Sequence, residues 1–189
     1  KSEVTMDNDA YKTVTDPSVF VKFWLKDFED AEGSKDKTAM LAWTTTPWTL
    51  PANMGLFVNP DFTYAKVKVG DEFYILAKDL LEKVFVDEKK QPIPFEIVNL
   101  IDGSELVGLS YEPLFEDSKY SGEGEENAYK VWGADYVSLE SGTGIVHSAP
   151  AYGEEDFNFG KEYGIPVFHV LDEYGKYLNG EFAGKDVWE

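Results

Sequence analysis

The chain has 189 residues, of which 43% are hydrophobic and 15% aromatic, so it can bury the core of one domain. It contains no cysteine, which excludes disulfides and thiolate metal sites, and no apolar run approaches the roughly 20 residues that cross a membrane. Its net charge of −19 and its lack of arginine argue against a protein that grips a long nucleic-acid duplex through phosphate contacts. Local contact with the end of a nucleic acid held by another domain stays compatible with this charge.

The first residues, KSEVTMDNDAYK, lack an initiator methionine and the apolar stretch of a signal peptide. We therefore expect an excerpt from a longer cytoplasmic chain that has no membrane partner.

Short strands dominate the predicted elements of the first half of the chain. Runs of β-branched and aromatic side chains predict strands at residues 18–25, 38–44 and 64–69. Residues 73–76 predict a hairpin partner for the third of these runs, because Gly70 lies in the turn between them. Residues 77–86 carry apolar side chains at helical spacing and predict a short helix, which the lysine-proline stretch 89–94 ends.

The second half continues the same pattern. Further strands are predicted at residues 95–100, 129–132, 135–139, 144–148 and 167–171. Residues 121–127 predict a polar loop and residues 172–176 a turn. Residues 154–163 predict a helix with an acidic first turn, which Gly164 and Pro166 end. Many short strands with few helices predict a β-rich α+β fold: a closed or nearly closed β-barrel with short peripheral helices.

The first unusual stretch is LAWTTTPWTLPAN, residues 41–53. Pro47 cannot donate a hydrogen bond to a β-ladder, so the strand should end there. On one interpretation the threonines are ordinary strand residues. On the other, backbone amides and threonine hydroxyls turn toward a pocket walled by Trp43 or Trp48, where hydroxyls suit a ribose or a carboxylate ester. Composition leaves both interpretations open.

The second unusual stretch is SGTGIVHSAPAYGEEDF, residues 141–157. Its glycines permit a close approach of the backbone to a ligand. A short apolar run then leads to His147, and Asp156 lies in the first turn of the predicted helix. These two side chains are either a core histidine and an acid that complements the helix dipole, or two members of a ligand site.

Other chemistries find less support in the sequence. The carboxylates have no fixed separation that would indicate a glycosidase pair, and there is no HExxH metal motif. The GxSxG motif of a hydrolase nucleophile elbow, the P-loop and GxGxxG are also missing from the sequence.

Taken together, the two stretches closely resemble the editing domain, called connective peptide 1, of isoleucyl-tRNA synthetases, which are class I aminoacyl-tRNA synthetases. The resemblance extends over essentially the whole chain. Pro47 and Trp48 after the threonines favour the isoleucyl family, since the related valyl and leucyl motifs carry an arginine there. Tyr152 stands where histidine or phenylalanine is common, and Glu155 where aspartate often stands.

The resemblance implies that residues 1–189 are a single editing domain of a longer synthetase. Residues 1–25 and 167–189 would then be the strands that connect it to the catalytic core. The implied reaction is hydrolysis of the ester of valyl-tRNA(Ile), with valyl-adenylate as a second candidate substrate. An aminoacylation pocket that accepts isoleucine rejects the smaller valine poorly, so a second site hydrolyses the wrongly charged product. Isoleucyl enzymes are the standard example of this limited discrimination. Two alternatives stay open, a valyl-type domain that cleaves threonyl-tRNA and a non-catalytic β-barrel module that binds a ligand.

The resemblance also implies roles for individual residues. It assigns catalysis to Thr44, Thr45, Thr46 and Asp156, and substrate binding to Asn53, His147, Trp48 and Asp156. Asp156 would hold the α-ammonium group of the substrate, and His147 would help to exclude the bulkier isoleucine. Water, oriented by the threonines, would attack the ester without a side-chain nucleophile. No metal or other cofactor is expected in this domain, because ATP, Mg²⁺ and the further candidate Zn²⁺ belong to the rest of the parent enzyme. The expected partners are that rest of the synthetase and the 3′ end of tRNA(Ile) carrying misattached valine.

Overall fold

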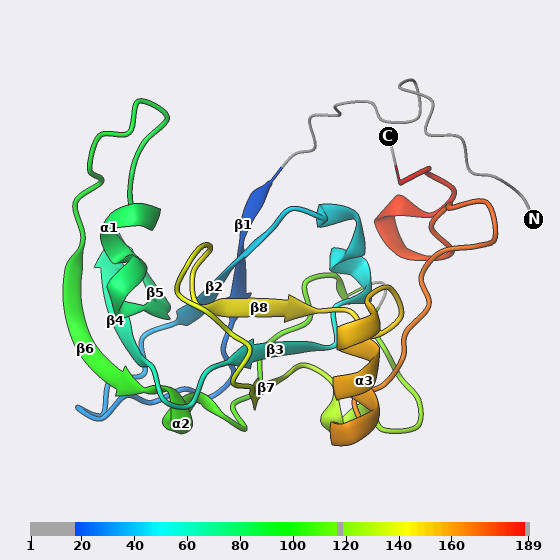
Figure 1. Ribbon diagram of the computed structural model, residues 1–189, viewed down its shortest axis with the longest axis horizontal. Helices are drawn as coiled ribbons and strands as arrows, with labels where there is room; N and C mark the ends of the chain where they lie inside the picture. The colour runs from blue at the N-terminus through cyan, green and yellow to red at the C-terminus, as the bar shows by residue number, and fades with distance from the viewer. Residues whose placement is uncertain (1–17, 117–118, 188–189) are drawn as a thin grey trace, which may run out of the picture.

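Two β-sheets contribute to the main core of the computed structural model, which describes residues 18–116 and 119–187 (Figure 1). The larger sheet has the order β1-β2-β5-β4-β6, with β1 Val19–Trp24, β2 Thr38–Thr44, β4 Thr63–Val69, β5 Glu72–Ala77 and β6 Glu96–Asp102. The smaller sheet has the order β7-β3-β8, with β3 Gly55–Val58, β7 Lys130–Gly133 and β8 Ile145–Ser148.

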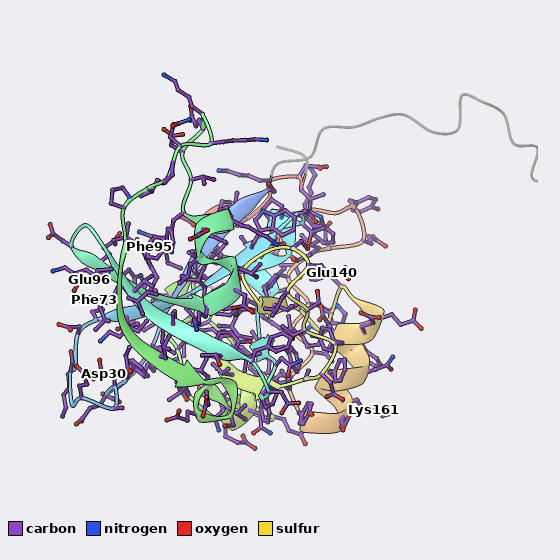
Figure 2. All side chains as sticks on the ribbon, turned by 60° about the vertical axis from the view of Figure 1, so that its left-hand side comes forward. Asp30, Phe73, Phe95, Glu96, Glu140 and Lys161 are labelled. Atoms are coloured by element: carbon purple, nitrogen blue, oxygen red, sulfur yellow. The ribbon has the colours of Figure 1, made fainter. Side chains whose placement is uncertain are left out.

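The helical elements in the described part of the chain are short. They are η1 Pro47–Ala52, η2 Lys78–Leu80, α1 Leu81–Val84, α2 Gly103–Leu106, η4 Glu125–Asn127, α3 Glu154–Tyr163 and η5 Gly180–Phe182. The longest, α3, ends at Gly164, whose φ of 68° lies in the left-handed region that glycine adopts readily. Lys161 in its last turn points away from the body of the molecule (Figure 2). The predicted helix 154–163 is therefore confirmed. Among the described residues, no helix is long and apolar enough to span a bilayer.

Strand pairing in the larger sheet follows the predicted hairpin. β4 and β5 are antiparallel with Val69 opposite Glu72, and Gly70 in the turn has a positive φ of 61°. β2 pairs antiparallel with β1 and parallel with β5. β2 is therefore an inner strand. It ends at Thr44, before Pro47, as the sequence predicts.

The core occupies both faces of the larger sheet. The main cluster joins the two sheets and includes the fully buried side chains of Phe23, Met40 and Leu56. A second cluster lies on the opposite face, where Phe85 after α1 packs on Phe95 before β6 with ring centroids 5.2 Å apart. Figure 2 labels Phe95 on the segment that leads into β6. Because β2 is covered on both faces, its sequence is a continuous apolar run instead of an alternating one.

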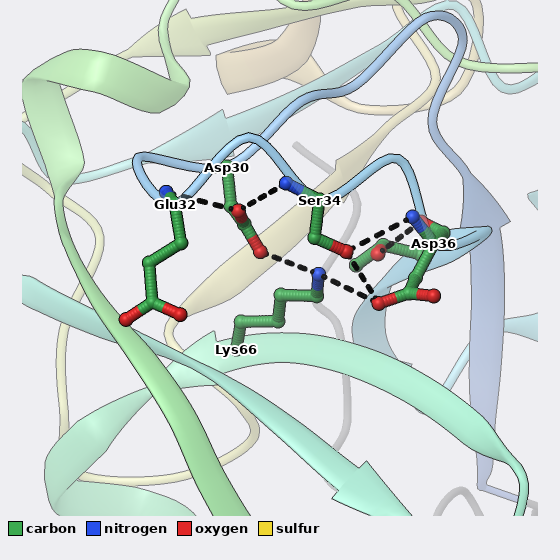
Figure 3. A network of polar contacts seen from close by, with 6 residues as sticks. Asp30, Glu32, Ser34, Asp36 and Lys66 are labelled. Atoms are coloured by element: carbon green, nitrogen blue, oxygen red, sulfur yellow. Dashed lines mark hydrogen bonds and ion pairs between the residues drawn. The ribbon is translucent and has the colours of Figure 1, made fainter.

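A buried ion pair holds the segment between β1 and β2 against the larger sheet (Figure 3). Lys66 on β4 is fully buried, and its Nζ lies 2.7 Å from Asp30 Oδ2 and 3.7 Å from Asp36 Oδ2. Asp30 also accepts N–H bonds from Glu32 and Ser34, 3.1 and 2.9 Å long. The hydrogen bond from Lys66 is the main reason why the pKa of Asp30 is lowered. This carboxylate therefore satisfies a lysine that would otherwise be a costly buried charge.

Three predicted elements differ from the structure. Residues 135–139 do not form a strand, because the side-chain amide of Asn59 binds the carbonyls of Asp135 and Val137. Residues 167–171 do not form one either; Leu171 makes only an isolated bridge to Tyr177. The predicted helix 77–86 is shorter, since its first residue completes β5.

The sequence prediction missed β3, the central strand of the smaller sheet. All four of its residues are buried, so its short apolar run shows no alternation. The β-rich α+β class is confirmed, but closure into a barrel is not, because each sheet has open edge strands in the described part of the chain. Residues 1–17 of the predicted first connecting segment lie outside the described residues.

Candidate active site

The two unusual sequence stretches meet at one cavity of about 280 Å³. The end of β2, the residues that follow it and the start of η1 form one side of the cavity. β8, the loop after it and the first turn of α3 form the other side. β2 and β8 lie side by side, and β8 leads directly into the loop before α3 (Figure 1). Six of the seven predicted site residues line the cavity: Thr44, Thr45, Thr46, Trp48, His147 and Asp156.

The threonine segment turns inward because β2 stops before Pro47. The Thr46 N–H donates to Thr44 Oγ1 over 3.1 Å, and the two threonine hydroxyls are 3.3 Å apart. The carbonyl of Thr46 then accepts from both the amide and the hydroxyl of Thr49, over 3.1 and 2.9 Å. These bonds hold the hydroxyls of Thr44 and Thr46 toward the same space. Thr44 is buried there, whereas Thr45 and Thr46 are exposed.

His147 has a protein partner at each ring nitrogen. Its Nε2 lies 2.9 Å from Thr49 Oγ1, and its Nδ1 lies 2.8 Å from the side-chain nitrogen of Asn53. Thr49 donates its own proton to the Thr46 carbonyl, so it accepts the proton of His147 Nε2, and Nδ1 accepts from Asn53. Burial lowers the pKa of His147 to about 4, which leaves the imidazole neutral at pH 7. With both nitrogens engaged, His147 shapes the cavity wall and is not a free base.

Asn53 is the predicted site residue that does not line the cavity. Its side chain is buried behind His147, and its amide nitrogen also donates to the Gly55 carbonyl over 3.0 Å. Its oxygen accepts from the hydroxyl of Tyr111 over 2.6 Å. The amide is therefore saturated by protein partners, and Asn53 supports His147 from behind.

Asp156 reaches the cavity from the first turn of α3. Its Oδ2 accepts the Ala149 N–H over 3.2 Å, which orients one carboxylate oxygen. Burial raises the pKa of Asp156, and the hydrogen bond from Ala149 partly opposes that effect. The carboxylate is therefore partly desolvated in the cavity. A cationic group of a ligand would stabilise its ionised form there.

The sequence prediction missed Thr49 and Tyr152. Thr49 lies one 3₁₀ turn after Thr46, a spacing that places both on the same side of η1. Tyr152 forms an aromatic wall with Trp48, their rings meeting edge to face at 5.5 Å. In the described part of the chain, no three His, Asp or Glu side chains cluster in a way that could hold a metal ion.

Comparison with known proteins shows the family of this chain. The family model "Leucyl-tRNA synthetase, editing domain" matches residues 113–185. An isoleucine–tRNA ligase of Pyrococcus furiosus is 44% identical over 187 residues, which are 95% of this chain and 17% of that protein. One of Corynebacterium diphtheriae is 41% identical over 200 residues, covering 100% of this chain and 18% of that protein. The chain belongs to the isoleucyl-tRNA synthetase editing-domain family.

Solved structures show the same fold at lower identity. The crystal structure of GlLeuRS-CP1 gives a TM-score of 0.66 at 17% identity and covers 91% of both chains. The P. knowlesi cytosolic leucyl-tRNA synthetase editing domain gives 0.61 at 15% identity and covers 90% of this chain and 89% of its own. The editing domain described here spans less than a fifth of the length of the two ligases it matches.

Proposed function

We propose that this domain hydrolyses the ester bond of valyl-tRNA(Ile), as the editing domain of an isoleucine–tRNA ligase. The observation that carries the proposal is the joint presence of Asp156, a neutral His147 and the threonine hydroxyls around one cavity of about 280 Å³. An aminoacyl ester offers a matching set of groups: an α-ammonium, a small side chain and a carbonyl with a neighbouring ribose.

Each group of the ester finds a counterpart in the cavity. The Asp156 carboxylate binds the α-ammonium in a charge-assisted contact and thereby orients the ester. His147, held rigidly by Thr49 and Asn53, limits the room for the aliphatic side chain and so disfavours isoleucine. The hydroxyls of Thr44 and Thr46 are donors and acceptors beside the reacting carbonyl.

The reaction follows from these positions without a covalent intermediate. Both nitrogens of His147 are engaged, so it does not activate a nucleophile. Water attacks the ester carbonyl, and the threonine hydroxyls orient it and stabilise the oxyanion that develops. When the tetrahedral intermediate collapses, the bond between the acyl carbon and the ribose oxygen breaks, and a proton from the attacking water passes to that oxygen. The products are free valine and tRNA with its ribose hydroxyl restored. Positioning and electrostatic stabilisation supply the acceleration.

The partner of this cavity is the single-stranded 3′ end of tRNA(Ile), delivered by the rest of a cytoplasmic synthetase. The net charge of −19 repels a polyanion at long range, so the domain depends on the rest of the synthetase for tRNA binding. We expect the 189-residue chain alone to deacylate mischarged tRNA far more slowly than the synthetase that carries it. Equal rates would contradict this dependence.

The decisive experiment compares Asp156→Ala with Glu155→Ala in the full synthetase. Glu155 is an exposed acid in the same helical turn and does not line the cavity, so it controls for charge and helix effects. Asp156→Ala should slow hydrolysis of valyl-tRNA(Ile) by at least about a hundredfold, because the ester is no longer oriented. Glu155→Ala should hydrolyse it at nearly the rate of the unchanged synthetase. Circular dichroism verifies folding. Normal editing by Asp156→Ala would refute the assignment.

Substrate choice is a separate measurement. Valyl-, isoleucyl- and threonyl-tRNA are compared as substrates, and faster cleavage of the threonyl ester would favour a valyl-type editing domain. A non-hydrolysable valyl-adenosine analogue that binds beside Thr46 and Asp156, with its isoleucyl counterpart excluded, would support editing. Indifference to both analogues would favour a non-catalytic module.

A further inference from the structure

The hydroxyl of Tyr152, on the aromatic wall of the cavity, binds the backbone of a segment that follows α3 in the sequence. That oxygen accepts two backbone N–H bonds, from Val170 over 2.8 Å and from Leu171 over 3.0 Å. A phenylalanine ring would fill the same space on the cavity wall but would leave both amides without this acceptor.

A second tyrosine ties the same part of the chain to the opposite member of the aromatic wall. Tyr177 is mostly buried, and its hydroxyl donates to the carbonyl of Trp48 over 2.8 Å. Trp48 and Tyr152 are in edge-to-face contact. Residues 168–177 therefore bind both members of this wall, one at the Tyr152 hydroxyl and the other at the main-chain carbonyl of Trp48. Figure 1 shows this orange-to-red part of the chain beside the helical turn that follows β2.

Residues 168–177 are also packed and internally hydrogen-bonded. Val170 and Tyr177 share a small apolar cluster with Ala52 of η1 and Ala149 after β8. Within the segment the Asp172 N–H donates to the Lys176 carbonyl over 2.9 Å, and just beyond it the Leu178 N–H donates to the Val170 carbonyl over 2.8 Å, so the segment forms a hairpin-like turn. A turn closed on itself moves as a unit, so a displacement at one tyrosine is transmitted to the other.

We propose that Tyr152 is a positioning residue that fastens residues 168–177 to the aromatic wall of the cavity, so that occupancy of the cavity and placement of this turn are coupled. The coupling to a ligand rests on the proposed function; the fastening itself does not. Tyr152 acts through the backbone of the turn and through Trp48, and a phenylalanine retains the wall but loses the fastening.

Amide hydrogen exchange on the 189-residue chain tests the fastening. In Tyr152→Phe, the Val170 and Leu171 amides should exchange about fivefold faster or more, the factor that corresponds to one lost hydrogen bond. Tyr163→Phe is the matched control, because Tyr163 lies on α3 and its hydroxyl donates to the Gly133 carbonyl over 3.3 Å, away from residues 168–177 in the described part of the chain. Unchanged exchange at both amides in a folded Tyr152→Phe chain would overturn the proposal.

A ligand arm tests the coupling. The non-hydrolysable valyl-adenosine analogue should slow exchange at Val170 and Leu171 in the unchanged chain, and Tyr152→Phe should weaken its binding about fivefold. Tyr177→Phe removes the other tie and should weaken binding in the same direction. An analogue that binds all variants equally would overturn the coupling. An analogue that fails to bind the unchanged chain would contradict the proposed function, while the exchange comparison still decides the role of Tyr152.

Discussion

Thr49 Oγ1 lies 2.9 Å from His147 Nε2, although 98 positions separate the two residues in the sequence. This hydrogen bond joins the threonine segment to β8, and the Thr49 hydroxyl in turn donates to the Thr46 carbonyl. Each residue from Tyr111 through Asn53, His147 and Thr49 donates to the next, and Thr49 donates to the Thr46 carbonyl. One series of hydrogen bonds therefore links the core to the cavity.

Removing the Thr49 hydroxyl should break the last two hydrogen bonds of this series. Thr49→Val leaves the proton of His147 Nε2 and one acceptor position of the Thr46 carbonyl unpaired, which should lower the free energy of unfolding by about 1–3 kcal/mol. Hydrolysis of valyl-tRNA(Ile) should fall with it, by about tenfold or more. Thr63→Val, at an exposed position on β4, is the control and should change neither quantity appreciably. Urea denaturation and single-turnover deacylation measure the two effects.

The lowered pKa of His147 makes stability depend on pH with a definite sign. The unfolded chain protonates this histidine near its usual pKa of 6.5, but the folded chain resists protonation down to about 4. Stability therefore falls as the pH decreases through this window, by roughly 2 kcal/mol between pH 7 and pH 5 from this group.

The difference between variants isolates that contribution from other titrating groups. Urea denaturation at pH 7 and pH 5 should show that His147→Gln loses this part of the pH dependence. His169→Gln, which replaces the other histidine, should keep it. Equal pH dependence in the unchanged chain and in His147→Gln would contradict a neutral imidazole at this position in the folded chain.

Gly153 leaves the space in which the Asp156 carboxylate lies. A Cβ at this position would come within 2.8 Å of Asp156 Oδ2, while the glycine φ of −130° is accessible to any residue. Gly153→Ala should therefore displace the carboxylate and raise KM for the aminoacyl ester about tenfold, with a smaller change in kcat.

A double-mutant cycle separates displacement from a general effect on the helix. In the Asp156→Ala background the contact is gone, so Gly153→Ala should cause little further loss of stability or activity. Equal losses in both backgrounds would show that Gly153 does not act through Asp156.

The buried pair of Lys66 and Asp30 should be costly to break on one side only. Lys66→Met leaves the Asp30 carboxylate buried without its cation and should lower the thermal midpoint by several degrees. The double variant Lys66→Met with Asp30→Leu should recover part of that loss, because it removes both charges. Scanning calorimetry measures both variants. A double variant less stable than Lys66→Met would contradict this account.

The same pair has its own pH window. Because its hydrogen bond with Lys66 lowers the pKa of Asp30, the stabilisation is present above the unfolded pKa of 3.8 and is lost as the pH falls through the lower folded value. Asp30→Asn should therefore be less stable than the unchanged chain at pH 7, and the difference should narrow below pH 3.8. A difference that stays constant over this range would exclude ionisation of Asp30 as its cause.

Local chemistry alone predicted several elements. Proline at 47 ends β2, glycine at 70 makes the β4–β5 turn, and Gly164 ends α3, because each imposes a backbone property that neighbours cannot alter. Strand β3 was not predictable in this way, since a short strand buried on both faces carries no alternating pattern.

The sequence by itself determined which chemical groups the site contains: the threonines, His147 and Asp156 stand in two stretches that resemble one family, and six of the seven predicted residues line one cavity. Only the tertiary structure decided how they are used. It placed Asn53 behind His147, engaged both imidazole nitrogens, and added Thr49 and Tyr152 to the wall. The physical reason is that these hydrogen bonds join distant segments, so their partners depend on how β2 and β8 pack and not on any local spacing.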